Sequence, residues 1–328
     1  MRKDRLYVVA TLLLTGAVLN ACSADDASVQ PQSAHSNIIS LTSSLAATRA
    51  ASDPQTTQLN TAVEVGVFGV SGLTTVSNGS NARYAVKADG SLTAKVSTME
   101  WPTTGSASLY AYAPYQSGWA LNANNVFTIS KDQSTEDGYL KSDLLYGMPV
   151  NNPVAQTDEA VQLKFRHLLT KMAIKVVKAA DDDTDFSKAT LTMMGTKIAT
   201  TVNLATGTLG EATGEAADIK VATSLGDWET VCIVVVPQTI AAGTELVRMV
   251  LGDKMMTAKL SSTVTLESGK AYSFTFNMVK AELCLGSISI TDWATGADLG
   301  VSNSVDETGN VESDFDGNAT EPARISKR

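Results

Sequence analysis

The sequence predicts an all-β protein, and three observations lead to this prediction. From Val63 onward, segments rich in Val, Thr, Tyr, Ile and Phe recur between turns of Gly, Asn, Asp and Ser, a spacing typical of β-sandwiches. Single strands show apolar alternation, as in Tyr272, Phe274 and Phe276. Hydrophobic residues make up 44% of the chain and charged residues 18%, which is ample material for a buried core. We expect little helix.

The expected elements follow in order along the chain. Val63–Phe68 begins the first strand, Ser108–Tyr115 is a strand that stops at its proline, and Asp143–Gly147 opens another element. Leu163–Val177 has the period of two that a sheet demands, with apolar residues on one face and Lys171 and Lys175 on the other. Gly252 and Asp253 form a two-residue hairpin turn between two strands.

The N-terminus has the pattern of a secretory signal. Basic residues at Arg2, Lys3 and Arg5 precede Leu6–Ala21, an uncharged run of 16 residues. A bilayer span takes roughly 20 apolar residues, so this run is short for a transmembrane helix. Leu19–Cys22 is similar to a bacterial lipobox, in which the cysteine sulfur carries the lipid. We therefore expect residues 1–21 to be removed and Cys22 to be lipidated, with plain cleavage and an uncleaved anchor as alternatives.

The charge of the chain limits its partners. Ser23–Asp26 resembles the serine-plus-acid signal that sends some Gram-negative lipoproteins to the outer face of the outer membrane, although a solvated linker also fits. Residues 1–21 hold three of the 25 basic and one of the 34 acidic residues, so the remainder carries 22 and 33, a net charge of −11. This balance argues against nucleic acid as a partner.

Residues 22–62 form a small-residue tether that contains one strand-like piece. Within it, Ile39, Leu41 and Leu45 alternate with small polar residues, as in a strand with one buried face. Arg49 follows, alone among small residues before Ala50. A lone arginine in such a loop is an accessible substrate for an arginine-specific protease. The alternative is a surface arginine with no role.

Residues 294–328 form a polar tail with one ordered-looking piece. Leu299, Val301 and Val305 occupy its first, third and seventh places, with a small polar residue at the fifth. This spacing matches Ile39 to Leu45. A match of seven residues also arises by coincidence, and Ile288 and Ile290 make an equally plausible last strand.

The residues that carry chemistry are few, and we predict no enzyme, no metal and no cofactor. The histidines are His35 and His167, and the sequence contains neither a nucleophile elbow, a phosphate loop nor a dinucleotide fingerprint. The acidic runs Asp181–Asp185 and Asp314–Asn318 lack a full set of calcium ligands, so we interpret them as solvated loops. For Cys232 and Cys284 the strand-like surroundings favour two buried thiols over a disulfide.

Several motifs together resemble the fimbrillin family, and they are ordered as in that family between residues 63 and 293. The Phe165–Met172 stretch resembles its "F-x-H-x-x-(S/T)-K" strand. The other similar pieces are Ala111–Tyr115, Asp143–Tyr146, Val235–Gln238, Leu266–Tyr272 and Ile290–Trp293.

This resemblance implies a precursor of a type V pilus subunit with two tandem transthyretin-like β-sandwich domains. We expect these domains at 63–158 and 159–293, after the signal (1–21) and tether (22–62) and before the tail (294–328). The resemblance further implies that an arginine-specific protease cuts the tether after transport to the outer membrane of a Gram-negative cell. Loss of the first strand then leaves a groove for a strand of another pilin subunit.

On this interpretation Ile39, Leu41 and Leu45 form the covering strand, and cleavage between Arg49 and Ala50 releases it together with the lipid. Leu299, Val301 and Val305 are the candidate donor strand. The predicted function is a structural subunit of a cell-surface fimbria. The alternative is a non-polymerising surface lipoprotein, that is an anchor, a tip adhesin or a glycan-binding protein, to which Trp101, Trp119 and Trp228 would contribute an aromatic surface.

Overall fold

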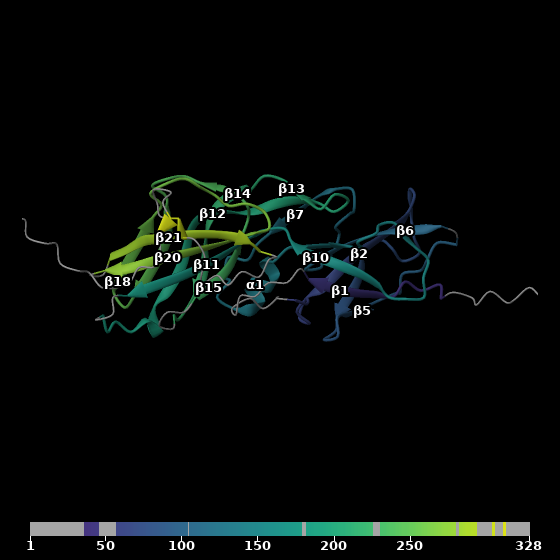
Figure 1. Ribbon diagram of the computed structural model, residues 1–328, viewed down its shortest axis with the longest axis horizontal. Helices are drawn as coiled ribbons and strands as arrows, with labels where there is room; N and C mark the ends of the chain where they lie inside the picture. The colour runs from purple at the N-terminus through teal and green to yellow at the C-terminus, as the bar shows by residue number, and fades with distance from the viewer. Residues whose placement is uncertain are drawn as a thin grey trace, which may run out of the picture. The chain divides into compact units, whose positions relative to one another are not determined.

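Strands make up nearly all the regular structure of this chain (Figure 1). The computed structural model describes residues 36–45, 57–103, 105–178, 182–225, 230–279 and 282–293, with the backbone of 304–305 and 311–312 in addition. Within these residues there is one α-helix, α1 (Glu136–Ser142), and one short 3-10 helix (Phe186–Lys188). No described helix has the length and hydropathy of a membrane span. The all-β prediction is confirmed, while the tandem transthyretin-like arrangement stays a prediction.

The first sheet closes on itself. Its strands pair in the cyclic order β2, β4, β5, β1, β10, β8 and β6, and β6 pairs with β2 again. Neighbours are antiparallel except β1 and β10, which run parallel. β3 and β9 extend the sheet beside β2 and β6. The strands are β1 (Leu41–Leu45), β2 (Glu64–Ser71), β3 (Thr74–Thr75), β4 (Ala82–Val86), β5 (Ser91–Ala94), β6 (Ser106–Ala113), β8 (Leu145–Met148), β9 (Val154–Ala155) and β10 (Val161–His167).

The remaining strands form two larger sheets and one small one. One sheet has the order β15, β11, β20, β21, β22, β23, and the other has β13, β12, β17, β18, with β14 and β7 also on β12. β16 pairs with β19. The strands are β7 (Asn124–Thr128), β11 (Thr170–Lys178), β12 (Thr190–Asn203), β13 (Thr208–Leu209), β14 (Thr213–Ala222), β15 (Thr230–Val235), β16 (Thr239–Ile240), β17 (Glu245–Leu251), β18 (Lys254–Lys259), β19 (Val264–Thr265), β20 (Lys270–Val279), β21 (Glu282–Asp292), β22 (Ser304–Val305) and β23 (Val311–Glu312).

Local sequence patterns explain several of these strands. Tyr272, Phe274 and Phe276 alternate on β20 and are all buried, as a strand with one core face requires. β17 and β18 form the predicted hairpin, in which Leu251 pairs with Lys254 across the turn. Gly252 in that turn has a φ of 57°, a left-handed conformation that favours glycine.

The buried side chains form two hydrophobic cores. One lies within the first sheet and includes Val65, Leu109 and Phe165. The other joins the remaining sheets and includes Ile174 and Phe274. The second core also includes Phe68 of β2, Tyr112 of β6 and Tyr146 of β8, so these strands of the first sheet contribute to both cores.

The stretch Leu163–Val177, which has the period of two of a sheet, forms two strands. β10 ends at His167 in the first sheet, and β11 starts at Thr170 in a different sheet, with the buried Leu168 and Leu169 between them. Lys171 is buried as well, so the predicted polar face does not include it. The period of two continues on both sides of the crossing, and for this reason the pattern does not reveal where the chain changes sheet.

Strand pairing links the parts of the chain on either side of residue 158. β10 follows this residue and pairs in the first sheet, whereas β7 precedes it and pairs with β12. The domain boundaries stay a prediction. No disulfide joins Cys232 and Cys284, but the expectation that both thiols are buried is wrong. Cys284 is exposed, and Cys232 is partly exposed because it lies in the less buried first half of β15.

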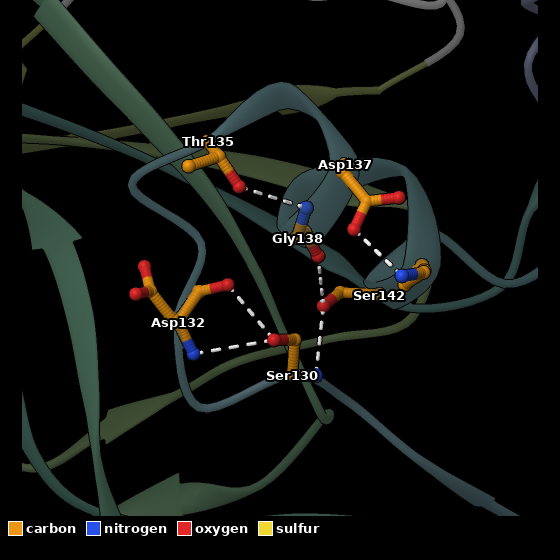
Figure 2. A network of polar contacts seen from close by, with 7 residues as sticks. Ser130, Asp132, Thr135, Asp137, Gly138 and Ser142 are labelled. Atoms are coloured by element: carbon orange, nitrogen blue, oxygen red, sulfur yellow. Dashed lines mark hydrogen bonds and ion pairs between the residues drawn. The ribbon is translucent and has the colours of Figure 1, made fainter.

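A polar network fixes α1 and the loop before it (Figure 2). The Thr135 side chain caps the helix by accepting from the Gly138 amide at 3.2 Å. The Ser142 hydroxyl donates to the Gly138 carbonyl at 2.7 Å and accepts from the Ser130 amide at 2.9 Å. Gly138 is required because a Cβ there would collide with the Asp132 carbonyl oxygen.

Candidate functional site

The strand β1 fills a gap in the first sheet between β5 and β10 (Figure 1). Along β10 the register runs in parallel from Leu41 opposite Val161 to Leu45 opposite Phe165. Along β5 it is antiparallel, with Leu41 opposite Leu92. β1 is thus the strand that closes the ring, and each of its edges has a partner.

The inner face of β1 is mostly apolar, with Ser43 as its polar residue. Ile39, Leu41 and Leu45 are 1%, 3% and 6% exposed, and all three belong to the core of the first sheet. Burial of three such side chains contributes roughly 5–9 kcal/mol before the entropy of ordering the strand is subtracted. The space that β1 occupies is therefore an apolar slot, which we call the β1 slot.

Backbone hydrogen bonds hold β1 along its length. The Ile39 amide donates to the Met99 carbonyl at 2.9 Å, and the Val161 amide donates to the Ser40 carbonyl at 2.8 Å. At the far end the Leu45 amide donates to the Thr57 carbonyl at 3.2 Å. Residues 46–56, which contain the predicted processing site at Arg49 and Ala50, lie outside the described residues. They connect two points that are hydrogen-bonded to each other.

Of the three residues named for the candidate donor strand, the structure describes Val305. The backbone of Val305, on β22, pairs with Ile288 of β21 in the second part of the molecule. Leu299 and Val301 lie outside the described residues, as does Cys22. Ile288 and Ile290 both belong to β21, so the alternative last strand exists. The structure does not bring Val305 to the β1 slot of its own chain.

A buried polar cluster joins the end of β10 to the end of β21. His167 Nδ1 lies 2.8 Å from Asp143 Oδ1, and both side chains are almost fully buried. The imidazole stacks on the Trp293 indole with 3.8 Å between ring centroids. The sequence contains no catalytic motif around His167, and it did not predict Asp143 as the partner of this residue. The two residues lie in separate motifs, Asp143–Tyr146 and Phe165–Met172, and nothing in the local sequence indicates that they meet.

A cavity of about 920 Å³ lies between α1 and the chain that leads into β2. Its lining includes Thr61, Glu64, Tyr115 and Leu140. Burial raises the pKa of Glu64, but hydrogen bonds and charge from Arg83 and Lys95 lower it by more, so that its pKa lies below the ordinary value. Among the described residues, no group of His, Cys, Asp and Glu side chains has the arrangement of a metal site.

Comparison with sequence models of known protein families identifies the family of this chain. The sequence model of the fimbrillin-like family matches residues 48–293, which is most of the chain. The chain belongs to the fimbrillin-like family. It is therefore a pilus-related surface protein, as the motifs between residues 63 and 293 predicted.

Solved structures support the fold of this fimbrillin-like chain. A candidate cell adhesion protein from Bacteroides ovatus ATCC 8483 matches with a TM-score of 0.60 at 18% identity, over 79% of this chain and 98% of that one. Another from Bacteroides uniformis ATCC 8492 matches with a TM-score of 0.59 at 22% identity, over 79% and 100%. At these identities the likeness concerns the fold alone. A search of curated protein sequences returns no match.

Two of the three tryptophans named for a glycan-binding surface lie in the described part of this fimbrillin-like chain, and both pack against other side chains. Trp101 is 3% exposed and lies in the core of the first sheet. Trp119 packs against Tyr112 with 4.7 Å between ring centroids. Trp228 lies outside the described residues. The two described candidates are thus used in packing.

Proposed function

We propose that this protein is a structural subunit of a cell-surface fimbria that assembles by protease-activated strand exchange. In this proposal the precursor is exported as a lipoprotein through Cys22 to the outer membrane of a Gram-negative cell. An arginine-specific protease then cuts between Arg49 and Ala50. The β1 strand leaves with the lipid, and a strand of another subunit takes its place.

The observation that carries the proposal is the position of β1 between β5 and β10. Without β1, both neighbours would expose unpaired backbone groups, and the β1 slot would lie open. Such an edge is a template for another chain, since a new strand restores the ladder hydrogen bonds while its alternate side chains fill the slot. The intact precursor covers this edge and so prevents premature assembly.

The position of Arg49 fits removal of the cover. It stands four residues after Leu45, the last residue of β1, and before Thr57, which accepts a hydrogen bond from Leu45. A cut there breaks the covalent link from β1 to β2 but leaves the hydrogen bonds and the buried side chains of β1 in place. The cut strand therefore stays bound until another strand competes for the slot, which favours exchange over simple loss.

The test uses the precursor produced without its signal segment and treated with an arginine-specific protease. We expect wild type to start at Ala50 after treatment and to form ladders of oligomers on a gel. Arg49→Lys keeps the charge but removes the cleavage site, so it should remain monomeric. Assembly of Arg49→Lys at the wild-type rate would show that cleavage at this position is not the activating step.

The second candidate is a surface lipoprotein that does not polymerise, such as an anchor, a tip adhesin or a glycan-binding protein. The cavity of about 920 Å³ beside α1 favours it, since a ligand needs a concave site. This candidate keeps its lipid. Sequencing the N-terminus of the protein taken from cells separates the two, because a start at Ala50 supports the pilin and a blocked Cys22 supports the lipoprotein.

A further inference from the structure

The inner face of β1 carries one polar residue among its apolar ones. Ser43 points inward between Leu41 and Leu45 and is 7% exposed. Its hydroxyl donates to the Gly90 carbonyl at 3.0 Å, and its own amide donates to the same oxygen at 2.8 Å. The inward places of the β1 slot are those of Ile39, Leu41, Ser43 and Leu45, in this order. The third place thus holds a small side chain that donates a hydrogen bond.

The turn between β4 and β5 explains why this place differs from the others. Gly90 closes that turn with a φ of 82°, and its amide donates to the Lys87 carbonyl at 2.9 Å. The turn lies directly against β1, since a Cβ at Gly90 would come within 3.0 Å of the Ser43 carbonyl oxygen. A large apolar side chain at the third place would press against the Gly90 carbonyl, whereas a small polar one bonds with it.

The C-terminal tail repeats this order of side chains. Leu299, Val301, Asn303 and Val305 have the spacing of Ile39, Leu41, Ser43 and Leu45. From the N-terminal end, the polar residue stands at the third place in both segments. In the opposite direction Asn303 would fall at the place of Leu41, which is 3% exposed. The two patterns therefore agree in one direction and one register.

We propose that the β1 slot selects the direction and register of its incoming strand through this polar place. This inference rests on the proposed strand exchange. The occupant is residues 299–305 of a second copy, running parallel to β10 and antiparallel to β5. Asn303 takes the place of Ser43, and its amide donates to the Gly90 carbonyl. A slip by two residues buries the Asn303 amide among apolar side chains without that partner, which is unfavourable.

Variants at Asn303 test the selection. Cleaved wild type and Asn303→Ser should assemble at similar rates, because serine is the residue that β1 itself carries. Asn303→Leu should slow assembly at least about tenfold, since it places a bulky apolar group against the turn. Ser302→Leu is the matched control, because this residue faces away from the slot in the proposed register, and it should assemble like wild type. Equal rates for Asn303→Leu and wild type would overturn the proposal.

Cross-linking reads the direction of the strand in the same assemblies. In the proposed direction residue 304 takes the place of Ser44, which pairs with Lys164. In a Cys284→Ser background, Ser304→Cys should therefore form a disulfide with Lys164→Cys of a second copy. Reversal brings residue 304 to the place of Ser40, and a disulfide with Ala160→Cys instead would overturn the proposal. If cleaved wild type forms no oligomers at all, the proposed strand exchange itself is wrong. This result differs from either disulfide, so the proposed function and the proposed register fail in different ways.

Discussion

Glu64 shows how single charges connect strands of the first sheet. Its carboxylate lies 2.6 Å from Arg83 Nε and 3.2 Å from Lys95 Nζ, which links β2 to β4 and to the residue after β5. These two cations hold its pKa below the ordinary value against the opposing effect of burial. A carboxyl group whose pKa is lowered on folding stabilises the protein above the unfolded pKa, and this contribution is lost as the pH falls through the folded pKa.

We therefore predict that Glu64→Gln lowers the melting temperature at about pH 7 and has a smaller effect at about pH 3. The groups are partly exposed, so about 1 M salt should also reduce the difference between variant and wild type. Thermal unfolding of both proteins under the three conditions measures this. A difference that does not change with pH would mean that Glu64 acts through its shape rather than its charge.

Single residues also show which features the local sequence predicts and which it does not. The alternation of Ile39, Leu41 and Leu45 was enough to predict an inward face, because the period of two is a local property of a strand. The role of Ser43 was not predicted, since its partner Gly90 lies 47 residues away. The pair of His167 and Asp143 was missed for the same reason. Local pattern gives the face of a residue, but not the residue that it meets.

At the scale of elements, β1 is a full member of the first core although it is short and lies outside the main run of strands. Leu41 pairs with Val161 on one side and Leu92 on the other. Thr42, the next residue, faces the other way and is partly exposed. Leu41 is thus a buried position and Thr42 a partly exposed one on the same strand, so a change at Thr42 is a control for a change at Leu41.

We predict that Leu41→Ala in the uncut precursor lowers the free energy of unfolding of the first sheet by roughly 2–5 kcal/mol, because it leaves a cavity in the core. Thr42→Ala should change it by no more than about 0.5 kcal/mol. Chemical denaturation followed by circular dichroism measures both. Similar small effects for the two variants would place β1 outside the stabilising core.

At the scale of the whole molecule, we expect the two cores to respond differently to cleavage at Arg49. β5 and β10 border the β1 slot, while β11 and β20 lie in the other core. The stack of His167 on Trp293 is a direct contact between the end of β10 and the second core. Phe68, Tyr112 and Tyr146 of β2, β6 and β8 also belong to the second core, but β1 pairs with β5 and β10 rather than with these strands. Removal of β1 should therefore affect the first sheet most.

We predict that hydrogen exchange, measured after cleavage at Arg49 and displacement of β1, rises by at least about tenfold in β5 and β10 because their amides lose partners. Amides of β11 and β20 should stay protected. The cleaved protein before displacement is the control and should exchange like the intact precursor. Uniform loss of protection across both cores would contradict this division and indicate one cooperative unit.

The sequence by itself determined the all-β class, the inward face of β1, the hairpin at Gly252 and the family. These follow from side-chain period, turn chemistry and ordered motifs, which are properties of neighbouring residues. Only the tertiary structure decided that β1 lies between β5 and β10, that the chain changes sheet at Leu168 and Leu169, and that Lys171 is buried while Cys284 is exposed. These depend on pairing between strands far apart in the chain, and the physical reason is that such contacts leave no period in the local sequence.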